Sequence, residues 1–361
     1  KSVLLLLSVG AANAFLAVSP MGMKAQATRA QRQALSLYMD AALIVQNKGG
    51  GHGEIGFHLA RQLRSKGLDV TLLQDSAAKM EKLPFKNYGE IEAEGVEIIS
   101  CNLEDPSRIL SSLSGKSFTH VFDNYAKDEK TVSTVAGLAK NTWRVKNYAY
   151  VSSAGMYESS VPQPMVETGA TKATGQRAVE EFLASQELPW TSFRPQYIYG
   201  PYTNKRDYLD WFFHRITRDR PCPLPGDGNQ MASVTRVEDV AAMLASVVGK
   251  EDAAKGQVFN CGTDNMVSYR QICEMIGQVV GKSPKIVTYN PKSFELPKGA
   301  FPFRNTEFCV TPEKAKKVLG WSRKHSLSED LPWYFESYKA AGLEGKAMEF
   351  EADEIILGAT V

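Results

Sequence analysis

The sequence has few cysteines, and none of them is spaced as a metal-binding or redox motif requires. The 361 residues include five cysteines, an odd number, and no Cys-x-x-Cys pair. They are Cys101, Cys222, Cys261, Cys273 and Cys309. Disulfide scaffolds normally have an even number of cysteines, and zinc sites have closely spaced pairs, so neither is indicated. We expect these cysteines to be small buried residues in a reducing compartment.

Acidic residues are absent from the first 39 positions, which carry four basic residues: Lys1, Lys24, Arg29 and Arg32. Because the whole chain has a formal net charge of +2, the remaining residues carry a net charge of −2. The part of the chain that folds is therefore not basic overall. Any binding to nucleic acid would need a local basic patch.

The N-terminus also lacks an apolar run long enough to cross a membrane, because its run covers only residues 3–9. Ala12-Asn13-Ala14 follows with the pattern of a signal-peptide cleavage site, and a basic stretch comes next. This layout resembles the two-part presequence of proteins imported into plastids of secondary origin. We therefore expect residues 1–39 to be such a presequence and the mature chain, without a transmembrane segment, to reside in the plastid stroma. Secretion is the alternative, but no Asn-x-Ser/Thr sequon supports it.

A glycine-rich loop follows the first buried strand, which we predict at residues 41–45. At the spacing of Gly50, Gly53 and Gly56, the backbone can turn tightly, approach a pyrophosphate and pack a helix on the strand. The next predicted strand ends near Asp75, which is placed to bond an adenosine ribose. We predict that these residues bind NAD(P); the alternative is a loop that is kept only for its shape.

Strands and helices alternate along the following residues. Further strands are predicted at 70–73, 96–99, 120–123, 148–151 and 190–193, with helices near 104–113, 128–141 and 172–186. This α/β alternation predicts a Rossmann-like doubly wound parallel sheet, whose ligands bind at the carboxyl ends of the strands. Ser152 lies at such an end and is a further candidate for cofactor binding. We expect this lobe at 40–200, a smaller C-terminal α/β lobe interleaved with it at 201–345, and a tail at 346–361.

No lysine follows a tyrosine by four residues anywhere in the chain. This absence matters because the glycine loop and residues 151–155 and 194–201 resemble the extended short-chain dehydrogenases/reductases. Members of that class use a tyrosine, activated by a lysine one helical turn later, to move the proton that accompanies hydride transfer. Counted back from Glu180, Lys172 occupies the tyrosine position and Gln176 the lysine position. We expect no ordinary hydride transfer and leave the catalytic residues unknown; the alternative is an atypical nucleotide-sugar epimerase or reductase.

Two further stretches are more specific. Residues 211–215 read Trp-Phe-Phe-His-Arg, and residues 289–292 and 300–304 read Tyr-Asn-Pro-Lys and Ala-Phe-Pro-Phe-Arg. With the missing dyad, they resemble the chloroplast stem-loop-binding proteins, most closely the "a" branch, over nearly the whole mature chain. The resemblance implies stem-loop RNA binding in plastids and endoribonuclease activity helped by a divalent metal such as Mg²⁺. It also implies association with further copies or a paralogue, and with plastid ribonucleoprotein or ribosomal assemblies.

Basic residues are interleaved with aromatic ones in the second predicted lobe. The candidate RNA-binding residues are Lys205, Arg206, Arg215, Arg218 and Arg220. Cationic groups neutralise phosphates, and aromatic rings such as Trp211 stack on unpaired bases. The alternative is an amphipathic helix with the aromatic residues in the core and the arginines in solvent. A second basic set is Lys282, Lys285, Lys292, Lys298 and Arg304, and no metal-ligand spacing or nuclease motif is visible.

Overall fold

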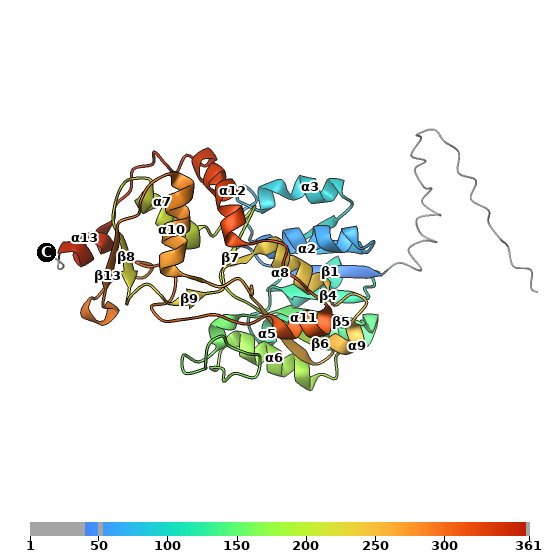
Figure 1. The fold of residues 1–361 in the computed structure, drawn as a ribbon. Coiled ribbons are helices and arrows are strands. Elements are labelled where there is room, and N and C mark those ends of the chain that lie inside the picture. Colours follow the sequence, from blue (N-terminus) through green and yellow to red (C-terminus); the bar gives the residue numbers. More distant parts are fainter. Residues whose placement is uncertain (1–39, 50–52, 359–361) are drawn as a thin grey trace, which may run out of the picture. The chain divides into compact units, whose positions relative to one another are not determined.

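A seven-stranded sheet forms the centre of the larger lobe (Figure 1). The computed structural model describes residues 40–49 and 53–358, so the predicted presequence lies outside the described residues. The strand order is β11-β6-β5-β4-β1-β2-β3. The bounds are β1 (Ala41–Gln46), β2 (Asp69–Asp75), β3 (Glu97–Cys101), β4 (His120–Asn124), β5 (Asn147–Val151), β6 (Trp190–Pro195) and β11 (Gln257–Cys261). Every neighbouring pair is parallel, which confirms the predicted Rossmann-like fold.

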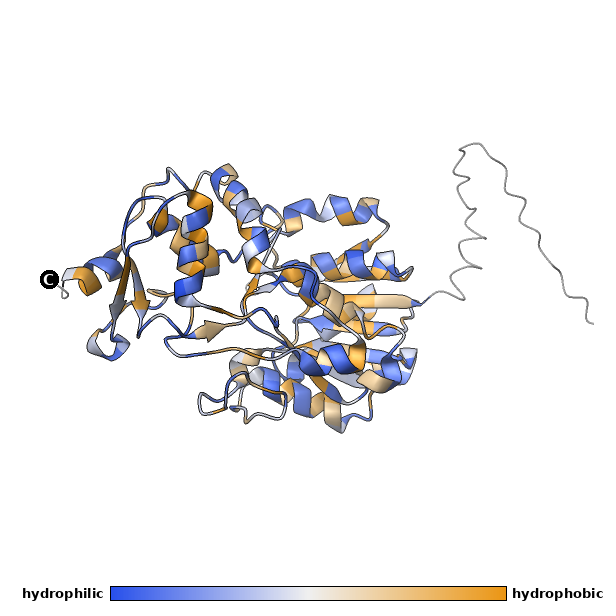
Figure 2. Cartoon of the chain, viewed as in Figure 1, coloured by the Kyte–Doolittle hydropathy of each residue, from blue (hydrophilic) through white to orange (hydrophobic). Residues whose placement is uncertain are grey.

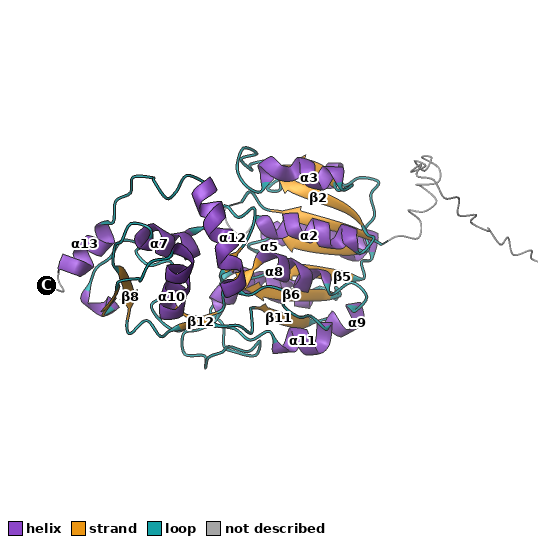
Figure 3. Cartoon of the chain, turned by 45° about the horizontal axis from the view of Figure 1, so that its top comes forward, coloured by secondary structure: helices purple, strands orange, loops and turns teal. Residues whose placement is uncertain are grey.

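Helices cover both faces of this sheet, and α2, α3 and α8 lie over one of them (Figure 3). The bounds on that side are α2 (Glu54–Ser65), α3 (Tyr88–Ala93), α8 (Val237–Ala245), α9 (Glu251–Ala254) and α11 (Glu313–Leu319). The opposite face carries α4 (Pro106–Ser112), α5 (Glu129–Leu138), which continues as a π-helix at Ala139–Trp143, and α6 (Gly175–Ser185). In β1, Ile44 faces the first helical layer and Leu43 the second, and both are fully buried. Strands covered on both faces must be apolar on both, as this one is.

Side-chain caps explain where several helices begin. The Asp128 carboxylate accepts a hydrogen bond from the backbone N–H of Thr131, whose side chain in turn bonds the backbone of Asp128 at the start of α5. Ser268 and Gln271 form the same reciprocal arrangement in the second lobe. Each cap satisfies backbone donors that a helix start leaves unpaired, and is worth about 0.5–2 kcal/mol.

The smaller lobe has an aromatic core. Its helices are α7 (Asp207–Ile216), α10 (Tyr269–Val280), α12 (Leu327–Ala340) and α13 (Glu351–Gly358). Short strands pair as β7 (Ile198–Tyr199) with β10 (Thr235–Arg236), β8 (Cys222–Pro225) with β13 (Ile286–Tyr289), and β9 (Met231–Ala232) with β12 (Val267–Ser268). Trp211, Phe212 and Phe213 of α7 are buried in this core, so the aromatic residues of the predicted basic segment are mainly structural. Figure 2 shows the matching two-sided hydropathy of α10.

The chain passes between the two lobes more than once. Although α8, β11 and α11 follow residue 200, they pack with the larger lobe. The predicted tail at 346–361 contains α13, whose Asp353 and Ile356 are buried. All five cysteines are buried and free, as expected. None of the described helices is long and apolar enough to span a bilayer.

Candidate functional site

A cleft of about 730 Å³ lies between the two lobes. One wall is formed where β1, β2, β4, β5 and β6 end, the position at which doubly wound sheets bind their ligands. The second lobe supplies the other wall. The residues that line the cleft include Asn47, Lys48, Asp75, Glu104, Asn124, Tyr125, Lys127, Ser152, Ser153, Gln176, Tyr197, Lys205, Tyr208, Phe303, Arg304 and Phe308.

Gly53, at the described end of the glycine-rich segment, is held against the sheet by Gln46, the last residue of β1. The Gln46 side chain donates a hydrogen bond to the Gly53 carbonyl at 3.1 Å and accepts one from Asn124 at 3.2 Å. A Cβ atom at Gly56 would lie 1.8 Å from Gln46 Oε1, so this position has no room for a side chain. Gly56 therefore lets the helix approach the strand closely, whereas a Cβ atom at Gly53 would make only ordinary contacts, and Gly50 lies outside the described residues.

The turn before the loop is equally well held. Asn47 donates from Nδ2 to the Asn124 carbonyl at 2.8 Å, and its Oδ1 accepts from the Gly49 amide at 2.7 Å. Gln74 donates to the Asn47 carbonyl at 2.9 Å. Gly49 has a φ of +85°, a conformation that favours glycine. These bonds fix the approach to the loop before any ligand binds.

Asp75 ends β2 and lines the cleft beside this loop. It is 5% exposed, and its Oδ1 accepts a hydrogen bond from the Ala77 amide at 2.9 Å. A carboxylate at this strand end suits a ribose hydroxyl. The described residues therefore fit the adenosine side of NAD(P): Gly56 brings the helix start close to the strand end, and Asp75 would hold the ribose. When bound, such a cofactor supplies hydride-transfer chemistry.

The position that would carry the proton-transfer pair is different. Gln176 lies in the first turn of α6 and lines the cleft, where it cannot provide the positive charge of a lysine. Lys172 precedes the helix and lines a neighbouring cavity of about 590 Å³ instead. Burial raises the pKa values of Tyr125 and Tyr197 in the cleft to about 12. Neither tyrosine is therefore poised to ionise near neutral pH.

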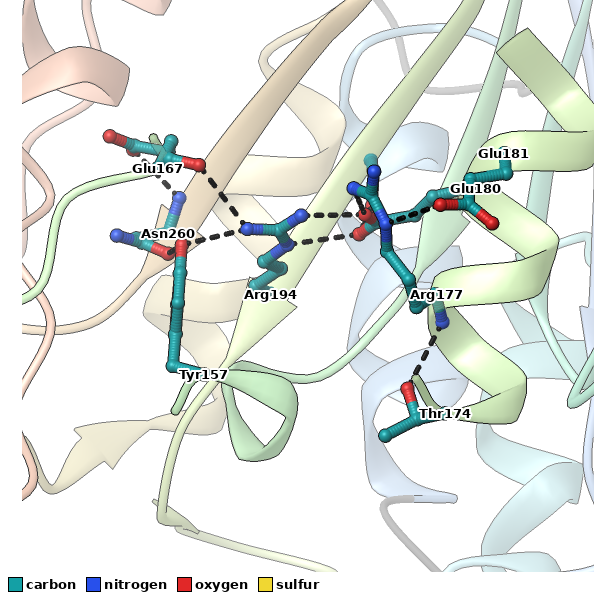
Figure 4. Close-up of polar contacts among 9 residues, drawn as sticks. Tyr157, Glu167, Thr174, Arg177, Glu180, Glu181, Arg194 and Asn260 are labelled. Atoms are coloured by element: carbon teal, nitrogen blue, oxygen red, sulfur yellow. Dashed lines mark hydrogen bonds and ion pairs between the residues drawn. The ribbon is translucent and has the colours of Figure 1, made fainter. Parts of the chain in front are cut away.

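A buried ion pair fixes the end of β6 behind the cleft (Figure 4). Arg194 donates to Glu180 at 2.6 Å, and each side chain is 2% exposed. Arg194 also donates to the Tyr157 hydroxyl at 3.0 Å, which donates to Asn260 at 2.7 Å. Burial alone would raise the pKa of Glu180, but the hydrogen bonds and charge of Arg194 outweigh it and lower that pKa. The pair has a structural role, and Tyr157 is fully buried with its hydroxyl engaged.

Comparisons with known proteins agree with this architecture. The model of the NAD dependent epimerase/dehydratase family matches residues 49–262. Chloroplast stem-loop binding protein of 41 kDa b from Arabidopsis thaliana is 33% identical over 317 residues, 85% of this chain and 82% of that protein. The chain belongs to the NAD dependent epimerase/dehydratase family and is a homologue of that stem-loop binding protein. The predicted "a" branch is not tested by a likeness to a "b" protein and stays a prediction.

Two solved structures share the fold. UDP-glucose 4-epimerase from Thermotoga maritima, with UDP-glucose, has a TM-score of 0.64 at 21% identity and covers 83% of this chain and 99% of its own. UDP-glucose 4-epimerase from Thermus thermophilus, in complex with NAD, has a TM-score of 0.61 at 20% identity with the same coverages. At these identities the likeness concerns the fold alone.

The predicted arginine cluster does not form an exposed patch. Arg215 is 6% exposed and pairs with Asp353 at 2.6 Å, so the alternative in which these arginines lie in solvent does not hold for this residue. Arg218 donates to the Leu343 and Lys346 carbonyls, and Arg220 pairs with Glu354. The reason is that the C-terminal segment and α13 pack over α7.

The remaining basic candidates differ in their surroundings. Arg206 pairs with Asp210 at 2.9 Å, and Lys282 pairs with Asp219 at 2.6 Å. Lys205 lines the cleft with its Nζ 4.8 Å from the centre of the Tyr208 ring. Arg304 also lines it, donating to the Gly155 carbonyl at 2.9 Å. Whether any of the predicted residues binds RNA stays a prediction.

The sequence prediction missed two cations of the cleft, Lys48 and Lys127. They follow the carboxyl ends of β1 and β4, so their position after predicted strands was the available signal. Lys127 lies 4.0 Å from Glu104, and both side chains are more than half exposed. Within the described ranges, no group of three His, Cys, Asp or Glu side chains could hold a metal ion. The divalent metal implied by the family resemblance therefore has no evident protein site in this part of the chain.

Proposed function

We propose that this chain is a plastid protein that binds stem-loop RNA and does not carry out ordinary hydride transfer. The likeness to the Arabidopsis stem-loop binding protein extends over 85% of the chain, which supports RNA as the ligand class. That relative is named as chloroplastic, which supports residues 1–39 as a plastid presequence. We expect the mature N-terminus at about residue 25–40, which sequencing of the native protein would test.

The observation that carries the proposal is the chemistry of the cleft. Among the described residues, four cationic side chains line it, against the two carboxylates Asp75 and Glu104. The cations are Lys48, Lys127, Lys205 and Arg304. Such groups neutralise phosphates, and the half-buried ring of Tyr197 in the same wall offers aromatic surface to a base. Because the folded part of the chain has a negative net charge, RNA binding would need a local basic patch, and the cleft is such a patch.

Gln176 supports the proposal that the chain does not carry out ordinary hydride transfer. This residue lies in the cleft at the lysine position of the dyad, and a neutral amide cannot lower the pKa of a proton donor as an ammonium group does. We make RNA binding, and not cleavage, the proposed activity because no described group in the cleft is identified as an acid or base. Association with further copies, a paralogue or plastid ribonucleoprotein assemblies belongs to the same proposal.

The test is a titration of a fluorescent stem-loop RNA, followed by anisotropy, with an unstructured RNA of equal length as control. The chain from Met39 onward, a compact unit of its own, is measured beside the full chain so that the basic N-terminus cannot produce the signal alone. We expect binding by both chains that weakens as salt rises. Absence of binding by the full chain would refute the proposal.

A second assay addresses the alternative of an atypical epimerase or reductase. The same protein is incubated with NAD⁺ or NADP⁺ and a small panel of nucleotide sugars, and turnover is followed by nicotinamide absorbance and by chromatography of the sugars. We expect none. Rapid epimerisation that is lost in Lys172→Ala or Ser152→Ala would show that the chain is an atypical nucleotide-sugar epimerase.

A further inference from the structure

The cleft combines a strand-end site that suits a dinucleotide with cationic side chains from the second lobe that a dinucleotide does not need. On the sheet side, the fixed turn and Asp75 suit one nucleoside and its phosphate. On the other side stand Lys205 and Arg304, contributed by the second lobe. A dinucleotide cofactor consists of two nucleosides joined through phosphates. Two consecutive nucleotides of RNA likewise place two nucleosides on either side of phosphate, although they are joined 3′ to 5′ through one phosphate and not 5′ to 5′ through two.

We propose, building on the RNA-binding function above, that this cleft takes two consecutive unpaired nucleotides from the loop of a stem-loop RNA. Asp75 then accepts a hydrogen bond from a ribose 2′-hydroxyl. RNA and a dinucleotide are mutually exclusive ligands, because both occupy the same space. Duplex RNA exposes no free base to such a cleft, so the loop enters it and the stem remains outside.

The second-lobe cations are held by contacts that keep them in the wall. Arg304 bonds the Gly155 carbonyl at 2.9 Å, and its guanidinium carbon lies 3.6 Å from the centre of the Phe308 ring. Lys205 lies over Tyr208, with its Nζ 4.8 Å from the ring centre. Neither side chain has an acidic partner among the described residues. A preorganised cation loses less freedom on binding phosphate, which favours a charged strand at this wall.

Aromatic rings lie beside these cations. Tyr208 and Phe303 stack at 5.4 Å between ring centres and 17° between planes. Tyr197 meets both rings edge-on, at 5.1 and 4.8 Å. All three line the cleft and are fixed by one another. Tyr208 and Phe303 are only 8% and 7% exposed, so the half-buried Tyr197 is the ring of this wall that is left to contact an unpaired base.

Asp75 supplies the discrimination between RNA and DNA. A carboxylate repels phosphate, so its presence in a nucleic-acid site requires a compensating hydrogen bond. The ribose 2′-hydroxyl, which DNA lacks, is the donor that can provide it. Substituting Asp75→Asn keeps the size and the acceptor for the Ala77 amide, but removes the charge. We therefore expect DNA to bind slightly better and the preference for RNA over DNA to fall by about tenfold.

The experiment measures the affinities for an RNA stem-loop and a DNA stem-loop of the same sequence. The variants are Asp75→Asn, the double variant Lys205→Ala/Arg304→Ala, and Lys317→Ala as a matched exposed lysine outside the cleft. A lower RNA preference in Asp75→Asn and weaker binding in the double variant support the proposal, with Lys317→Ala unchanged. A merely structural role for Asp75 would change both affinities alike and leave their ratio unchanged. Thermal melts of each variant detect loss of folding.

Competition provides a separate readout. NAD⁺ is titrated into the RNA complex, and its own binding is measured by calorimetry. If NAD⁺ binds, it should displace RNA in proportion to its occupancy; simultaneous binding of both ligands overturns the proposal. If NAD⁺ does not bind, the ratio of the affinities for RNA and DNA in Asp75→Asn tests the proposal instead. A chain that binds RNA while every cleft variant behaves as wild type refutes this inference alone, whereas a chain that binds no RNA refutes the proposed function.

Discussion

The substitution Arg215→Ala should detach the C-terminal helix α13. Arg215 and Asp353 form an ion pair at 2.6 Å whose side chains are 7% and 1% exposed. The guanidinium group also lies 3.6 Å from the centre of the Trp211 ring. Truncation to alanine leaves the Asp353 carboxylate buried without its cation, which costs about 3–5 kcal/mol if the helix stays in place.

Detachment of α13 from the rest of the chain limits the free-energy cost of leaving Asp353 without its cation. Since α13 is the last described helix, it can move into water and hydrate Asp353 while the rest of the chain stays folded. The principal loss is then the burial of Ile356, which is 2% exposed and worth about 1.5–3 kcal/mol. We therefore expect the free energy of unfolding to fall by about 2–3 kcal/mol, with α13 detached.

Hydrogen exchange of the α13 amides and urea unfolding together measure this effect. Arg220→Ala is the matched control, because its partner Glu354 is 68% exposed and a surface pair is worth about 0–1 kcal/mol. Protection of α13 should be lost in Arg215→Ala and largely kept in Arg220→Ala. Equal stability losses in the two variants, or α13 amides that stay protected in Arg215→Ala, would refute the reasoning.

Three shorter predictions concern other parts of the chain. Gly56→Ala should weaken folding and ligand binding because its Cβ would lie 1.8 Å from Gln46 Oε1, whereas Gly137→Ala, with open space in α5, should be neutral or stabilising in a thermal melt. Burial and the nearby Arg218 lower the pKa of His214 to about 4, so its contribution to stability should be complete above about pH 6.5 and lost as pH falls towards 4. His214→Gln should flatten that part of a stability–pH curve. If the four cleft cations each contact one phosphate, log Kd for RNA should change with log salt by about three units, and a slope near zero would contradict this site.

Much of the fold was predictable because its signals are local. An apolar strand, the glycine spacing and Asp75 lie within 35 residues, and they suffice for the first β-α-β unit. The burial of Arg215 could not be predicted because its partner is distant in the sequence: Arg215 meets Asp353 across 138 residues. Sequence periodicity identifies a helical face, but it does not tell which later segment covers that face.

The cleft could be predicted only in part, for the same reason. Its sheet side follows from strand ends, so Asp75 and Ser152 were available from the sequence. Its other wall comes from two separate segments, around Lys205 and Arg304, which meet only in the folded chain. The proposed ligand class rests on the resemblance to a family, while the residues that would contact the ligand required the tertiary structure.

Several residues around the cleft are present although the tyrosine–lysine pair is absent, and their presence can be explained without a bound cofactor. The Glu180–Arg194 pair is buried and would be costly to break, and Gln46 packs against Gly56 as part of the sheet lobe. Stability of the fold alone therefore accounts for the end of β6 and for Gly56. Asp75 is different, because its side chain bonds only the nearby Ala77 amide among the described residues. A buried carboxylate that the fold does not require is best explained by a ligand, and this makes Asp75 the most informative residue to change.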